Sequence, residues 1–150
     1  YAPHLVSKRM WDKVGGFSEE FNPGTASDPD FNMKLWDNGV RIFKGINNFK
    51  VYHFVSIVTK KINKPSEKKI NIKSISSKTF LLKWGITIKF FKKFYLKTNK
   101  KFDGPLKDPK KNLNFLFNYF LCKVNYFYIK IFYFKYYKKI FTYNKKLNLK

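Results

Sequence analysis

The sequence predicts an α/β segment followed by a basic, aromatic-rich and mainly helical tail. Two observations predict the first part: helix signals over residues 8–14 and 29–37, and strand patterns over residues 40–43 and 49–55. A third observation predicts the tail, because lysine, asparagine and aromatic residues dominate the chain beyond Thr59. At 150 residues, we expect one small domain with an appendage.

The first helix and the turn after it are marked by short side chains and glycine. Ser7 can cap a helix over residues 8–14, and Gly15 is placed to end it. The pair Gly15 and Gly16 then opens a loop in which backbone geometry matters more than side chains, and residues 22–24 are a strong turn signal.

The second helix carries start and stop signals at both ends. Ser27 or Asp28 can serve as its cap, with Pro29 at the first helical position. The body runs through Asp37, and Gly39 follows its end. The two strand patterns come next, and in the second one the alternation of side chains places His53 among apolar neighbours.

The tail is predicted to be helical after a linker. Residues 61–76 have the composition of a solvated linker, which places a boundary near residue 60. Residues 77–97 have apolar side chains at helical spacing with a soft break at Gly85, and residues 113–141 favour helix on length. We therefore expect three regions: residues 1–60, 61–76 and 77–150.

The net charge of +23 is concentrated in the second half of the chain. Residues 1–60 contribute +2, whereas residues 61–150 contribute +21. Clustered lysine suits an anionic membrane surface or nucleic acid. Nucleic acid is the less favoured partner, because Arg9 and Arg41, the two arginines of the chain, lie outside the tail. An AT-rich genome would impose the same lysine, asparagine and aromatic bias.

Cysteine usage and hydropathy bear on the compartment. The single cysteine, Cys122, rules out an internal disulfide and sits among aromatic residues, where a buried thiol is expected. Lys123, Lys130 and Lys135 interrupt the most apolar stretch, so we expect no membrane-spanning helix. A cytoplasmic protein, associated peripherally with a membrane, fits these features. Because the chain enters patterned sequence at Tyr1, we also expect it to be a carboxyl-terminal piece of a longer protein.

The chemistry-bearing residues are gathered between Gly15 and Asp30. A glycine turn, which allows a substrate to approach the backbone, precedes Glu19, and Asp28 and Asp30 stand at a helix start. The positive end of a helix favours a carboxylate, and a carboxylate there can act as a general base. The plainer interpretation is that Asp28 is a helix cap, that the glycines are a helix stop and that Glu19 lies in a solvated turn.

In order and spacing, residues 4–60 resemble the acceptor-side segment of the inverting GT-A glycosyltransferases of family 2. The resemblance implies a Rossmann-like α/β fold, with Asp28 as the base that deprotonates the acceptor hydroxyl. It also implies acceptor-binding roles for the glycine turn and the remaining acidic positions, namely Gly15, Gly16, Phe17, Glu19 and Asp30. The sequence differs from the common pattern at Ser18 and Ser27, where members often carry aspartate and glutamate. The chain has no glutamine, which disfavours a processive polymerase.

The resemblance also implies a metal, a donor and an acceptor. A family histidine near the donor diphosphate corresponds to His53, which could contact Mn or Mg; a core histidine is the alternative. The nucleotide-binding half of the family would lie upstream, so this segment alone should not turn over a nucleotide-sugar donor. The implied acceptors are glycans or lipid-linked sugars in cell-surface polysaccharide or glycolipid synthesis. A basic module for nucleic acid is the alternative function, although it leaves residues 15–39 unexplained.

Overall fold

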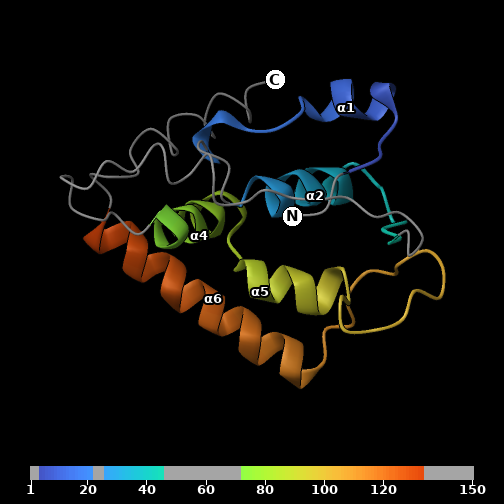
Figure 1. Ribbon diagram of the computed structural model, residues 1–150. Coiled ribbons are helices and arrows are strands. Elements are labelled where there is room, and N and C mark those ends of the chain that lie inside the picture. The colour runs from blue at the N-terminus through green and yellow to red at the C-terminus, as the bar shows by residue number, and fades with distance from the viewer. Residues whose placement is uncertain (1–3, 22–25, 46–71, 134–150) are drawn as a thin grey trace.

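The computed structural model describes residues 4–21, 26–45 and 72–133, and these residues form a helical assembly (Figure 1). Two elements are not α-helical: η1 (Glu19–Phe21) is a 3₁₀ helix, and η2 (Phe91–Tyr95) is a π-helical turn. In chain order the elements are α1 (Lys8–Val14), η1 (Glu19–Phe21), α2 (Ser27–Asp37), α4 (Ile72–Trp84), α5 (Ile88–Phe90), η2 (Phe91–Tyr95) and α6 (Leu113–Phe132).

The helices stack in layers. In Figure 1, α4 and α5 lie between α2 on one side and α6 on the other, and α1 lies beyond α2. Contacts between side chains support this order: Trp84 and Tyr95 reach α2, while Phe90 packs on Phe115 of α6 with ring centroids 5.1 Å apart. The layer of α4 and α5 therefore joins the start of the chain to α6.

The first helix forms as its local signals predict. The Ser7 hydroxyl accepts a hydrogen bond from the Met10 amide at 3.3 Å, which caps α1. Gly15 has φ of 70°, the left-handed conformation that ends a helix. Both predictions, the cap and the stop, are confirmed.

The second helix ends where expected and begins earlier. It ends at Asp37, and Gly39 follows with φ of 86°. The residue at the cap position is Ala26, in the left-handed conformation with φ of 72° and no side-chain cap bond. The prediction that Ser27 or Asp28 caps the helix is wrong, because Asp28 is already the second residue inside α2.

The predicted α/β fold is wrong, because the described residues contain no strand. Residues 40–45 are irregular, and residues 49–55, with His53, lie outside the described part. Arg41 is occupied otherwise: its guanidinium lies 4.1 Å from the Trp36 ring and donates to the Trp36 carbonyl at 2.7 Å. The Arg41 carbonyl accepts from Leu106 in a loop rather than from a neighbouring strand. The backbone groups of a strand pair with those of a neighbouring strand. Because the described residues form no such pairing, a Rossmann-like GT-A segment is not supported.

The tail helices confirm the predicted break and correct one boundary. The break at Gly85 is confirmed, since its φ of 69° separates α4 from α5. However, α4 begins at Ile72, inside the predicted linker. The side chain of Asn112 caps α6 by accepting from the Phe115 amide at 2.9 Å. The predicted helix over residues 113–141 is confirmed as far as Phe132.

One hydrophobic core joins the two sides of the predicted boundary. Phe21 and Trp36 from the first part of the chain belong to the same buried cluster as Phe80, Phe91 and Phe115 from the tail. The expected burial of the cysteine is confirmed, as the thiol of Cys122 is free and buried in this cluster. No helix within the described residues is long and apolar enough to cross a membrane.

Candidate functional site

The Asp28 carboxylate lies in the first turn of α2 and is partly open to solvent. Its side chain is 20% exposed, and Oδ1 is 3.8 Å from Nδ1 of His4. The first turn of a helix presents backbone N–H groups without intrahelical partners, and these favour a negative charge. Asp28 therefore lies where the end of α2 favours a negative charge.

An aromatic cluster borders this carboxylate. Phe31, which is fully buried, forms its floor, and the rings of Trp11 and Phe17 each lie 5.2 Å from it. His4 closes the cluster with an edge contact to Phe31 at 5.7 Å. Trp11 and Phe17 are 37% and 47% exposed, so this cluster (His4, Trp11, Phe17 and Phe31) offers an apolar surface beside Asp28.

The glycine turn packs against the aromatic cluster. Gly16 has φ of 57° and is buried, and a Cβ atom there would lie 2.7 Å from Cζ2 of Trp11. Gly15 also has a positive φ, but a Cβ atom on it would meet nothing within 4 Å. Gly16 is thus required by close packing, whereas Gly15 is required by backbone conformation alone.

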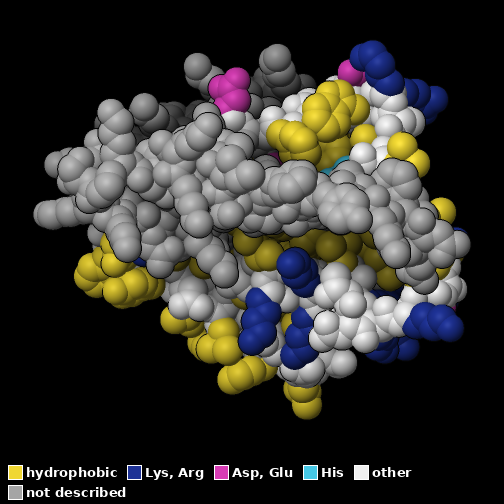
Figure 2. Space-filling view, in the orientation of Figure 1, with side chains coloured by type: hydrophobic (Ala, Val, Ile, Leu, Met, Phe, Trp, Pro, Cys, Tyr) yellow, Lys and Arg dark blue, Asp and Glu magenta, His cyan; other side chains and the backbone are white. Residues whose placement is uncertain are grey.

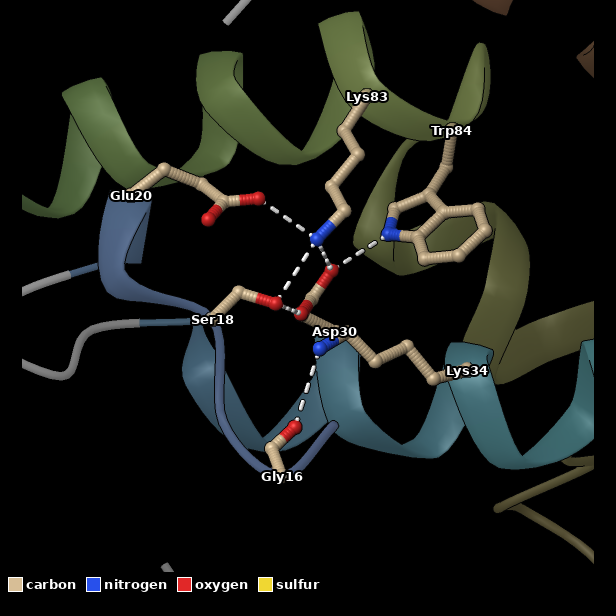
Figure 3. Close-up of polar contacts among 7 residues, drawn as sticks. All are labelled: Gly16, Ser18, Glu20, Asp30, Lys34, Lys83 and Trp84. Carbon is tan, nitrogen blue, oxygen red and sulfur yellow. Dashed lines mark hydrogen bonds and ion pairs between the residues drawn. The ribbon is translucent and has the colours of Figure 1, made fainter. Parts of the chain in front are cut away.

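Lys34 fastens the glycine turn to α2. Its Nζ donates to the Gly16 carbonyl at 3.0 Å (Figure 3). Burial lowers the pKa of Lys34 from 10.5, and the charge of Lys83 lowers it further, while Asp30 and Glu20 act in the opposite direction. Burial and Lys83 thus disfavour the charged form of Lys34, and the carboxylates of Asp30 and Glu20 partly offset this effect.

Asp30 lies in a buried network beneath the turn. Its side chain is fully buried, with Oδ2 accepting from the Ser18 hydroxyl at 2.6 Å (Figure 3). Oδ1 accepts from Nε1 of Trp84 at 2.7 Å and lies 2.9 Å from Nζ of Lys83. Nζ of Lys83 also donates to Ser18 at 2.9 Å and to Glu20 at 2.7 Å.

The buried network (Ser18, Glu20, Asp30, Lys83 and Trp84) fixes three elements relative to one another. It ties the start of α2 and the residues around η1 to the last turn of α4 (Figure 3). Among the described residues, every buried side-chain nitrogen or oxygen has a hydrogen-bond partner. The network can therefore hold the first turn of α2, and with it Asp28, in one position.

The structure divides the residues singled out from the sequence into three groups. Asp28 lies beside the aromatic cluster, which includes Phe17 and packs on Gly16. Asp30 faces the interior, and Glu19 is exposed at the start of η1. His53 lies outside the described residues.

Sequence reasoning missed His4, Lys83 and Trp84. Two leucines, Leu81 and Leu82, precede the pair Lys83 and Trp84 in a helical pattern. A lysine within such an apolar run is a signal for a buried ion pair. No comparable signal marks His4, because its neighbours Asp28 and Phe31 are distant in sequence.

The expected metal contact, His53, lies outside the described residues, so the divalent metal stays a prediction. The described residues contain no group of three or more histidine, cysteine, aspartate or glutamate side chains that could hold an ion. Asp28 and His4 form only a pair, and the carboxylate of Asp30 is occupied by Ser18, Lys83 and Trp84. The chemistry available at this site is that of a carboxylate beside an apolar surface.

Comparisons with known proteins return no match: no family model, no curated protein and no solved structure matches the chain.

Proposed function

We propose that this chain supplies the acceptor side of an inverting glycosyltransferase, an enzyme that moves a sugar from a nucleotide-sugar donor to an acceptor hydroxyl. The observation that carries the proposal is the contrast between two carboxylates of α2. Asp28 lies partly exposed beside the glycine turn and the aromatic cluster, whereas Asp30 is fully buried and held by three donors. Of the two carboxylates, Asp28 is the one that is accessible to solvent and so to a substrate.

In the proposed reaction Asp28 is the general base. It takes the proton of the acceptor hydroxyl as that oxygen attacks the anomeric carbon of the donor sugar, and the bond from that carbon to the nucleoside diphosphate breaks. The nucleoside diphosphate leaves with the bonding electron pair, and a single displacement inverts the anomeric configuration. General-base catalysis of this kind contributes about 100- to 10,000-fold to a rate.

The surroundings of Asp28 support binding of a sugar acceptor. The exposed parts of Trp11 and Phe17 supply an apolar surface on which the C–H face of a sugar ring can lie. The fixed turn at Gly16, held by Lys34, sets the distance between this surface and α2. The proposed acceptors are glycans or lipid-linked sugars of cell-surface polysaccharide or glycolipid synthesis.

The donor and its metal are proposed to bind to a nucleotide-binding part other than the described residues. The proposed proton transfer runs through Asp28 and needs no metal at that atom. We place the enzyme in the cytoplasm, at the membrane surface, in agreement with the free thiol of Cys122 and the charge of the tail.

The activity is tested with the natural full-length protein. It would be incubated with a panel of nucleotide sugars and with membrane glycolipids and surface polysaccharide as acceptors, and the release of nucleoside diphosphate would be measured. Proton NMR of the product would give its anomeric configuration. We expect acceptor-dependent release and an inverted product. Release that is independent of acceptor, a retained configuration, or no transfer with any donor would contradict the proposal.

A further inference from the structure

The outward side of α6 is an uninterrupted apolar surface. The residues that contact the core, Phe115, Cys122 and Ile129, recur every seven positions and define the inward side of the helix. On the opposite side, Leu113, Phe117, Phe120 and Ile131 are between 62% and 85% exposed. The same outer face also includes Leu116, Leu121, Val124, Phe127 and Tyr128.

Polar residues of α6 are confined to its flanks. Helical geometry places Asn118 and Asn125 along one border of the outer face and Lys123 and Lys130 along the other. Nζ of Lys123 lies 4.9 Å from the centre of the Tyr119 ring and close to Gly85, at the border between α6 and the helices that it covers. A helix of 20 residues is about 30 Å long, so the apolar face exceeds what an isolated surface residue would present.

A concentration of positive charge adjoins the amino-terminal end of this face. Lys110 and Lys111 precede the cap residue of α6, Asn112, and Nζ of Lys93 lies 3.5 Å from Oδ1 of Asn114 in the first turn of the helix. Beside them is a hollow of about 360 Å³, lined by Ile88, Lys89, Lys92, Lys93, Thr98 and Asn99. Lysine ammonium groups with hydroxyl and amide donors suit a phosphate group.

The space-filling view shows the same combination on one face of the molecule. Hydrophobic side chains gather along the lower edge of Figure 2, where Figure 1 places α6, and lysine or arginine side chains lie next to them. Apolar side chains bordered by cations match a bilayer surface, with acyl chains beneath anionic headgroups.

Charge decides between a membrane and a second copy of the chain. A second copy would bring the same excess of 24 basic over three acidic residues in its own residues 61–150. Two copies with this net charge repel each other, whereas binding to anionic lipid gains about 1 kcal/mol for each lysine near the membrane surface.

We propose that the outer face of α6 docks onto an anionic lipid bilayer, with the helix in the plane of the membrane surface and the lysines around its start in contact with headgroup phosphates. The body of the protein takes the place of the polar face of an ordinary interfacial helix. This docking is independent of the proposed sugar transfer, because it involves the side of the molecule formed by α6.

The test measures sedimentation of the full-length protein with vesicles. One set contains equal parts of phosphatidylcholine and phosphatidylglycerol, and the other contains phosphatidylcholine alone. We expect binding to the anionic vesicles that weakens as salt is raised, and at least tenfold weaker binding to the neutral ones. Equal binding to both sets, or binding to neither, would overturn the proposal.

Two variants that each introduce a glutamate locate the contact. Phe120→Glu alters the outer face of α6, whereas Ile42→Glu alters an apolar residue of equal exposure, 61% against 62%, outside α6. We expect Phe120→Glu to reduce binding to anionic vesicles by about tenfold or more and Ile42→Glu to leave it unchanged. An equal effect of both variants would contradict docking through α6.

Two further measurements complete the test: the depth of residue 120 in the bilayer and the oligomeric state of the protein. Phe120→Trp should lose fluorescence in vesicles made with brominated lipids, and Ile42→Trp should not. If Phe120→Glu instead dissolves a dimer seen by analytical ultracentrifugation without vesicles, the face is an interface between copies and the proposal fails. Binding of an oligonucleotide in place of vesicles would overturn it as well.

Discussion

At the first turn of α2, two carboxylates two residues apart face different environments. Asp28 is partly exposed near His4, whereas Asp30 is fully buried and accepts hydrogen bonds from Ser18 and Trp84. Side chains two residues apart on a helix point about 200° apart, so one of them can meet solvent while the other meets the core. The residue that can meet a substrate and the residue that holds the helix are therefore distinct.

The glycine turn gives a prediction at the scale of single residues. Gly15→Ala and Gly16→Ala both place a Cβ atom at a positive φ, which costs about 1–2 kcal/mol. Only Gly16→Ala also collides with Trp11, at 2.7 Å, and overpacking adds about 1–3 kcal/mol. Urea denaturation should show a larger loss of unfolding free energy for Gly16→Ala. Equal losses would mean that Trp11 does not pack on the turn.

Lys34 gives a prediction of pH dependence. Because its pKa is lowered from 10.5 in the folded protein, the unfolded chain binds more protons at Lys34 as the pH approaches 10.5. The contribution of Lys34 to the free energy of unfolding therefore rises with pH in this range. Urea denaturation of the natural protein and of Lys34→Met should show the natural protein gaining on the variant as pH increases. A difference that stays constant or falls would contradict the lowered pKa.

At the scale of elements, the buried network joins α2 to α4. Lys83 is 6% exposed and lies between the carboxylates of Asp30 and Glu20, at 2.9 Å and 2.7 Å. Removing one member of a buried ion pair leaves an uncompensated charge inside the protein. The relative position of α2 and α4, and hence of Asp28, depends on this lysine.

Two lysines with different surroundings test the network. Lys83→Met should cost about 3–5 kcal/mol of unfolding free energy, because Asp30 remains buried without its cation. Lys8→Met removes an exposed pair with Asp12 within α1 and should cost about 0.5 kcal/mol or less. The double variant with Asp30→Asn should lose less than the sum of the two single losses. Additive losses in this double-mutant cycle would show that the two side chains do not interact in solution.

Elements governed by local signals could be predicted, and elements that need distant partners could not. Ser7 and Gly15 act on their own helix, and Gly85 breaks its helix through its own φ. The expected strand over residues 40–43 would need a neighbouring strand to pair with, and the local sequence does not show whether one is present. In the fold, Arg41 stacks on Trp36 and pairs with Asp108 at 3.1 Å.

In the candidate site, too, the features that depend on local sequence could be predicted, and those that depend on distant contacts could not. The placement of Asp28 at a helix start follows from its local sequence, and so does the turn at Gly16. The inward position of Asp30 depends on Lys83 and Trp84, which are more than 50 residues away in sequence. Such contacts arise from packing, so the pattern around Asp30 alone could not assign its environment.

At the scale of the whole molecule, two surfaces lie on different sides of the α4 and α5 layer. The Asp28 site is built on α1 and α2, and the outer face of α6 lies on the other side of that layer (Figure 1). If α6 rests on a membrane, the site around Asp28 is held at the height of the intervening helices above the bilayer. That placement suits an acceptor whose sugar extends from a lipid anchor.

The most direct test of the account replaces Asp28 in the natural full-length protein. Asp28→Asn keeps the shape of the side chain and removes its basicity, so the turnover number for sugar transfer should fall about 100- to 10,000-fold. The dissociation constant of the donor should stay the same. Asp37→Asn, an exposed residue at the last position of α2, is the control and should transfer sugar at the rate of the natural protein. Transfer by Asp28→Asn at that same rate would contradict the role of Asp28 as the general base.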